Sequence, residues 1–144
     1  MEMRTLVSFE ATGFADESRW SENGSPLVPD GRSIAGTIVS GLRGTGLEAS
    51  DPEQHEFYGW AFEVVSVNET EWCLLQCPGP WLLLVRQRRS MLRRLCLSKG
   101  TENLETVLKA IDRVIKQEGR FSGIQWFTEA AYEARAQKGA DAPL

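Results

Sequence analysis

The alternation of apolar and polar residues predicts a chain of strands interrupted by two amphipathic helices. Residues 4–10 alternate as a strand does. From Gly31 to Gly44 or Gly46, apolar side chains recur at four-residue steps, which predicts a helix that Asp30 caps. Residues 101–118 predict the second helix, with Thr101 as its N-cap. The apolar stripe of this second helix consists of Leu104, Val107, Leu108, Ile111, Val114 and Ile115.

The centre of the chain predicts further strands. Residues 58–67 alternate, whereas residues 71–77 and 81–85 are apolar on both faces, which is typical of central strands. Residues 91–97 predict one more strand, although a short helical segment fits them as well. In the first of these strands, alternation places on one face Tyr58, Trp60, Phe62 and Val64.

Together these elements predict an α+β fold. Consecutive strands joined by tight turns pair antiparallel, so we expect a mainly antiparallel sheet of four to five strands. Two principal amphipathic helices are expected to pack on one face of this sheet, and a short C-terminal helix is expected over residues 128–136. Residues 1–136 would then form a single domain, and residues 137–144 a flexible C-terminal tail.

Two segments have the composition of loops. Residues 11–31 contain scattered glycines, prolines and acids, and residues 47–56 contain four acids. A lone tryptophan in a loop, such as Trp20, more commonly covers the core than contacts a ligand. Gly36 and Gly41 weaken the first helix by about 1 kcal/mol each relative to alanine, either to allow a close approach to the sheet or simply as a cost.

Composition and charge narrow the class of protein. The 144 residues are 42% hydrophobic and 25% charged, which is average for a globular domain. The net charge is −4, but residues 1–72 hold 13 acids and 4 bases, whereas residues 73–144 hold 7 acids and 12 bases. An acidic chain argues against nucleic-acid binding. The asymmetry fits either two halves that neutralise each other or a surface that steers one protein partner.

The chain shows no signal for a membrane or for export. Its longest apolar stretch, residues 72–85, is interrupted and too short for a membrane span. Residues 1–4 show no basic segment ahead of an apolar one, so no secretory signal is expected. Three cysteines, an odd number, suit the reducing cytosol. We therefore expect a cytoplasmic protein, with its oligomeric state left open.

No catalytic, cofactor or metal motif is recognisable. A single histidine, His55, is the one imidazole base available to a nucleophile. Cys73 and Cys77 lie four residues apart on a strand, about 13 Å from each other, which is too far for one zinc site. The glycines of residues 41–46 end a helix instead of opening one, so they form no phosphate cradle. We expect no cofactor and no metal, and the lack of a catalytic set favours a non-enzyme.

Five arginines fall within nine residues near the middle of the chain. On a hairpin tip they could bind an anion such as phosphate. A solvated turn, whose arginines pair with acids of the N-terminal half, is the favoured alternative. No aromatic residue lies among them to support binding of single-stranded nucleic acid. The candidate anion-binding residues are Arg86, Arg88, Arg89, Arg93 and Arg94.

The leading functional hypothesis is a small cytosolic protein-binding module without catalytic activity. In size, acidity and order of elements the chain is loosely similar to small bacterial proteins with a mixed sheet, among them toxin-neutralising immunity proteins. No motif carries a residue across from them. An immunity-type or regulatory role would use loop acids to steer a basic partner and a tryptophan to anchor it. The candidate interface consists of Asp51, Glu53, Glu56, Tyr58 and Trp60.

The alternative hypothesis is a small-molecule-binding domain or enzyme with an aromatic pocket between sheet and helices. Five tryptophans are many for this length, and some of them could line an exposed face or a cleft. The sequence leaves open which face of residues 58–67 is covered. The candidate pocket residues are Tyr58, Trp60, Glu63 and Cys73.

Overall fold

The fold is built on one antiparallel sheet. The computed structural model describes residues 2–67, 69–76, 80–88 and 101–144. Over these residues seven strands form the main sheet, in the order β4-β6-β7-β8-β1-β9, and β5 pairs with the same edge of β6 as β4 does. The strands are β1 (Leu6–Ala11), β4 (Glu48–Ala49), β5 (Glu53–His55), β6 (Gly59–Ser66), β7 (Glu69–Gln76), β8 (Trp81–Arg88) and β9 (Phe121–Phe127).

The predicted α+β class with a mainly antiparallel sheet is confirmed, but the expected count of four to five strands is wrong. The additional strands include β4 and β5, which are only two and three residues long. They belong to the sheet through main-chain pairing with β6, which leaves no apolar alternation to detect. A further strand, β9, is a short aromatic segment that pairs with β1. The strand predicted over 91–97 lies outside the described residues.

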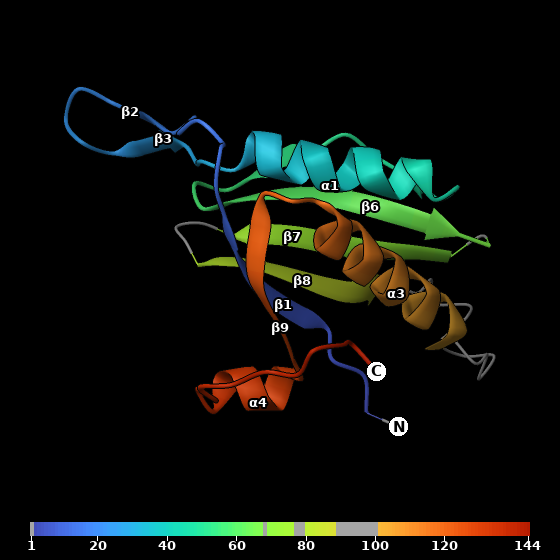
Figure 1. Ribbon diagram of the computed structural model, residues 1–144. Coiled ribbons are helices and arrows are strands. Elements are labelled where there is room, and N and C mark those ends of the chain that lie inside the picture. Colours follow the sequence, from blue (N-terminus) through green and yellow to red (C-terminus); the bar gives the residue numbers. More distant parts are fainter. Residues whose placement is uncertain (1, 68, 77–79, 89–100) are drawn as a thin grey trace.

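Two helices lie on one side of the sheet (Figure 1). They are α1 (Arg32–Gly44) and α3 (Thr101–Gln117), and their buried side chains belong to one apolar cluster with those of the strands. The helices approach each other closely at Gly41, because a Cβ added there would overlap the Val114 side chain. Gly36, in contrast, has nothing within 4 Å of such a Cβ. The close approach at Gly41 is therefore to the other helix and not to the sheet.

The first helix starts one residue later than Asp30 would place it. Its N-cap is Gly31, at φ 110°, and no side chain caps the helix. Asp30 instead accepts the Gly31 N–H through Oδ1 at 2.8 Å. A Cβ at position 31 would lie 2.7 Å from a ring carbon of Trp81, so glycine meets both the backbone and the packing requirement.

The predicted loop over residues 11–31 contains a second, two-stranded sheet. Strands β2 (Arg19–Trp20) and β3 (Pro26–Val28) pair antiparallel as a short hairpin. Figure 1 shows this hairpin projecting from one end of the sheet, beyond the start of α1. Trp20 does not cover the core, because its side chain is 62% exposed.

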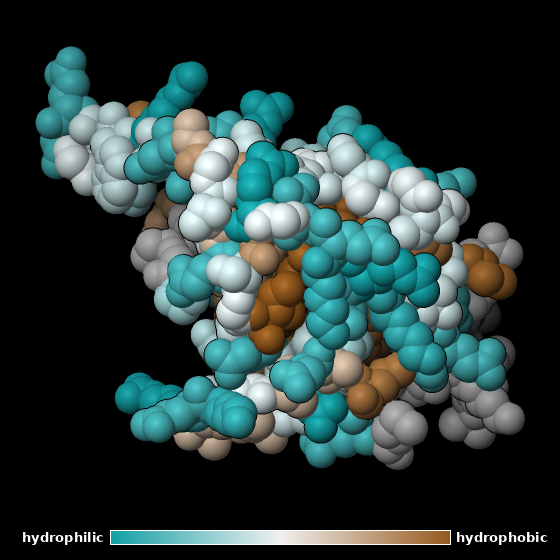
Figure 2. Space-filling view, in the orientation of Figure 1, coloured by the Kyte–Doolittle hydropathy of each residue, from teal (hydrophilic) through white to brown (hydrophobic). Residues whose placement is uncertain are grey.

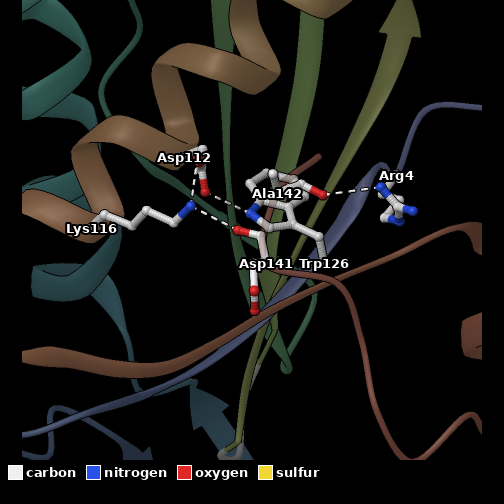
Figure 3. A network of polar contacts seen from close by, with 6 residues as sticks. All are labelled: Arg4, Asp112, Lys116, Trp126, Asp141 and Ala142. Atoms are coloured by element: carbon white, nitrogen blue, oxygen red, sulfur yellow. Dashed lines mark hydrogen bonds and ion pairs between the residues drawn. The ribbon is translucent and has the colours of Figure 1, made fainter. Parts of the chain in front are cut away.

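The C-terminal residues lie far from the β2–β3 hairpin, near α4 (Glu129–Glu133) and the N-terminus (Figure 1). Ala140 exchanges two backbone hydrogen bonds of 2.8 Å with Trp126 of β9. The Arg4 guanidinium donates to the Ala142 carbonyl at 3.2 Å (Figure 3). The flexibility expected of residues 137–144 stays a prediction.

A polar network holds this tail to α3 (Figure 3). The Trp126 indole N–H donates to Asp112 Oδ1 at 2.8 Å. The Lys116 ammonium donates to Asp112 Oδ2 at 2.9 Å and to the Asp141 carbonyl at 2.7 Å. We call these three side chains, together with residues 139–142, the C-terminal clasp.

Candidate functional site

An aromatic pocket of about 440 Å³ lies at the end of the sheet where the β2–β3 hairpin projects. It brings together the hairpin, the turn between β5 and β6, the segment before α1, and the first residue of β8. This size is within the range of about 300–1,000 Å³ that is usual for ligand pockets. The described residues that line it are Asp16, Ser18, Trp20, Pro26, Val28, Pro29, Asp30, Phe57, Tyr58 and Trp81.

The four aromatic rings differ in how firmly the fold holds them. Trp81 is buried, with 8% of its surface exposed, and packs over Gly31. Tyr58 is half-buried, and its ring contacts both His55 and Phe57 edge-on. Trp20 and Phe57 are exposed, at 62% and 57%. The pocket therefore has a fixed aromatic base and an exposed aromatic rim.

Aromatic contacts connect this rim to the sheet. The His55 ring lies 5.3 Å from that of Trp72 on β7 and 5.7 Å from that of Tyr58, measured between centroids. Phe57 follows at 5.5 Å from Tyr58. Such edge-on pairs stabilise each other modestly, so the turn that carries Phe57 and Tyr58 is supported from the sheet side. His55 has a packing role in this row.

Two aspartates stand in the pocket lining, and main-chain donors orient both. Asp16 Oδ1 accepts hydrogen bonds from the Ser18 hydroxyl at 2.6 Å and the Ser18 N–H at 2.9 Å. The hydroxyl donor, then the N–H donor, lower the pKa of Asp16, so its carboxylate is charged at neutral pH. Asp30 Oδ1 accepts from the N–H groups of Gly31 and Glu17, at 2.8 and 2.9 Å.

A second, more polar hollow of about 530 Å³ adjoins the aromatic pocket and shares Asp16, Ser18 and Val28 with it. Trp60 lines this hollow and donates its indole N–H to the Pro29 carbonyl at 3.0 Å. The guanidinium of Arg32 lies over the Trp60 ring, 5.7 Å from its centroid. The fold therefore already places a cation on an aromatic face beside the pocket.

The structure separates the predicted interface residues. Glu53 and Glu56 are exposed on β5 and in the following turn, close in sequence to Tyr58 of the pocket. Asp51 is exposed but forms an ion pair with Arg43 at 2.8 Å. Trp60 is buried at 6% exposure, so its ring is covered where an interface anchor needs to be exposed.

Of the predicted pocket residues, Tyr58 alone lines the aromatic pocket among the described residues. Trp60 lies in the adjoining hollow. Cys73 is fully buried in the core, where burial, and then the charge of Glu71, raise the pKa of its thiol. Glu63 alternates with Phe62 and so points to the sheet face away from the helices. The pocket is thus at the hairpin end and not between sheet and helices.

Most of the arginine cluster lies outside the described residues, namely Arg89, Arg93 and Arg94, and the side chain of Arg88 is not described either. Arg86 is exposed on β8, and its guanidinium lies 3.8 Å from the carboxylate of Glu129. At this distance and exposure the pair contributes little to stability. Anion binding by the cluster stays a prediction.

Trp20, Phe57 and Trp81 line the pocket, although no pattern in the sequence singles them out as pocket residues. They line the pocket from distant parts of the sequence: the hairpin, the turn before β6 and the start of β8. The two hairpin strands are too short to give a periodic signal. The signal in the sequence is that all three residues are aromatic, and this alone does not indicate that they line one pocket.

The part of the chain that the structure describes contains neither a metal-binding cluster nor a membrane-spanning helix. Within it, no three His, Cys, Asp or Glu side chains are grouped so that they could hold a metal ion. None of the described helices is long and apolar enough to cross a membrane. Comparison with protein-family models, with curated proteins and with solved structures finds no match to this chain.

Proposed function

We propose that this protein is a protein-binding module, without a catalytic step of its own, that recognises its partner through the hairpin end. By hairpin end we mean the aromatic pocket together with the exposed residues around it. The observation that carries the proposal is the pocket of about 440 Å³ with four aromatic side chains in its lining. Aromatic side chains in pockets are the usual anchors of protein interfaces.

The exposed apolar residues favour a protein as the ligand. Trp20 and Leu27 on the hairpin and Phe57 on the facing turn are all more than half exposed. Figure 2 shows the hairpin as a projecting lobe whose surface is mostly hydrophilic or intermediate in hydropathy, with a small hydrophobic spot. Large apolar side chains at a pocket rim cost little to expose singly, but together they gain from contact with a partner.

The charge distribution favours a basic partner. Residues 1–72, which supply the whole pocket lining except Trp81, hold 13 acids against 4 bases. Exposed acids accelerate the encounter with a basic surface and fix its orientation more than they add affinity. An immunity-type role, in which this surface covers a basic site of a partner, is the narrowest form of the proposal.

A small-molecule ligand is the second candidate, because the pocket volume also suits a compound of moderate size. A compound that binds there raises the melting temperature without any protein present. A thermal-shift screen of aromatic and cationic compounds separates this candidate from the first.

The proposal is tested by capture from source cells with three forms of the tagged protein: wild type, Trp20→Ala and Tyr132→Ala. Tyr132 is an exposed aromatic residue on α4, away from the pocket lining, and serves as the matched control. We expect a stoichiometric protein that high salt releases, bound by wild type and Tyr132→Ala and lost from Trp20→Ala. Equal capture by Trp20→Ala, or capture that Tyr132→Ala also loses, contradicts the proposal.

A further inference from the structure

The aromatic pocket has the chemistry of a site for a cation. The faces of aromatic rings carry partial negative charge and attract a cation within about 6 Å of the ring centroid. The pocket gathers Trp20, Phe57, Tyr58 and Trp81 around one space, from three separate parts of the chain. An ammonium or guanidinium group in this space would face several rings at once.

The polar part of the lining agrees in sign. The pocket lining includes the carboxylates of Asp16 and Asp30, and no lysine or arginine is among its described residues. Hydrogen bonds from Ser18 hold Asp16 in place, and the N–H groups of Gly31 and Glu17 hold Asp30. A neutral or acidic occupant would cover these carboxylates without a counter-charge, which is unfavourable.

The same chain uses this chemistry twice within its own fold. Arg32 lies over Trp60 at 5.7 Å in the adjoining hollow, and Arg120 lies over Phe14 at 4.1 Å. Both are guanidinium groups on exposed residues above aromatic faces. The pocket repeats the aromatic half of this arrangement and leaves the cationic half to a ligand.

We infer that the aromatic pocket binds a lysine or arginine side chain of a basic peptide segment in the partner. This inference rests on the proposed function and names the group that enters the site. The side-chain stem would lie along the exposed rings of Trp20 and Phe57, and the charged head would lie between Trp81 and the two aspartates. The pocket is larger than one charged head, so the neighbouring peptide backbone also has room.

The test is a titration followed by NMR of the five indole N–H signals, one for each tryptophan. The probes are the N-acetyl methylamides of lysine, arginine and norleucine, the last being the neutral counterpart of lysine. We expect the two cationic probes to shift the Trp20 and Trp81 signals and to leave that of buried Trp126 unchanged. We expect them to bind about threefold more tightly than the norleucine probe. Norleucine binding of equal strength, or no shift at Trp20 and Trp81, overturns the inference.

A pair of variants checks the role of the carboxylate. Asp16→Asn should remove most of the preference for lysine over norleucine, because it removes a charge from the pocket. Glu133→Gln removes a charge from exposed α4, outside the pocket lining, and should keep the preference. A preference that both variants keep would exclude Asp16 and contradict the arrangement inferred here.

Failure of this inference is distinguishable from failure of the proposed function. If norleucine binds as tightly as lysine while Trp20→Ala still loses the captured protein, the proposed function stands and the cation specificity is wrong. If Trp20→Ala keeps the captured protein, the proposed function is wrong, whatever the probes show, and the inference falls with it.

Discussion

Two tryptophans, one in the C-terminal clasp and one at the hairpin end, have contrasting surroundings. At the C-terminal clasp, Trp126 is fully buried, and its indole donates to Asp112 while its backbone pairs with Ala140. At the hairpin end, Trp20 is 62% exposed on a two-residue strand. The first tryptophan satisfies its polar atom and its apolar surface inside the fold. The second leaves most of its surface available, which is what a binding residue requires.

The largest effect is expected from removing the buried ring. Trp126→Ala should lower the free energy of unfolding by about 3–5 kcal/mol, because it leaves a cavity and removes the hydrogen-bond donor to Asp112 Oδ1. Trp20→Ala should change it by no more than about 0.5 kcal/mol, as exposed substitutions do. Urea denaturation of both variants measures the difference. A similar loss of unfolding free energy in the two variants would show that the fold depends on both tryptophans alike.

The contrast between a filled and an open environment also exists within α1, at two glycines. Gly41→Ala should destabilise the protein by about 1–3 kcal/mol, because the new Cβ overlaps Val114 of α3. Gly36→Ala should stabilise it by about 0.5–1 kcal/mol, because its Cβ meets nothing within 4 Å and alanine favours the helix. Thermal melts of the two variants make the comparison. Stabilisation by both would show that the helices separate at little cost.

A smaller effect concerns how firmly the tail and the hairpin are held. The amides of Ala140 and Gly24 each donate one backbone hydrogen bond, to Trp126 at 2.8 Å and to Ser21 at 3.0 Å. The clasp surrounds the first with further contacts, so we expect its hydrogen-exchange protection factor to be at least about tenfold higher, or about 1.4 kcal/mol. Equal protection would instead support the flexible tail that the sequence predicts.

The sequence predicts the structure well where a periodic pattern of apolar residues determines which side chains are buried. The six apolar residues proposed for the second helix, from Leu104 to Ile115, are all buried in the apolar cluster that α3 shares with α1 and the sheet. The segments 71–77 and 81–85, apolar on both faces, correspond to β7 and β8, which lie inside the sheet. In these places burial follows from the local pattern, because the helix or strand period fixes which side chains share a face.

Local pattern failed where main-chain pairing or distant contacts decide the structure. Strands β4 and β5 are too short to show a period, and they join the sheet through main-chain hydrogen bonds, which depend little on the side chain. The pocket depends on Trp20 and Phe57, which are 37 positions apart in the numbering and line it from the hairpin and from the turn between β5 and β6. The sequence shows that the N-terminal half is acidic, but it does not indicate which other aromatic residues line the pocket with Tyr58.

The contact between Gly31 and Trp81 gives a criterion for recognising relatives of this protein. A side chain at position 31 would face both a left-handed backbone at φ 110° and a ring carbon 2.7 Å away. A homologous chain that lacks glycine there therefore needs a smaller residue at the position of Trp81, and would lose the base of the pocket. These two positions, read together, separate relatives that can share this pocket from relatives that share only the fold.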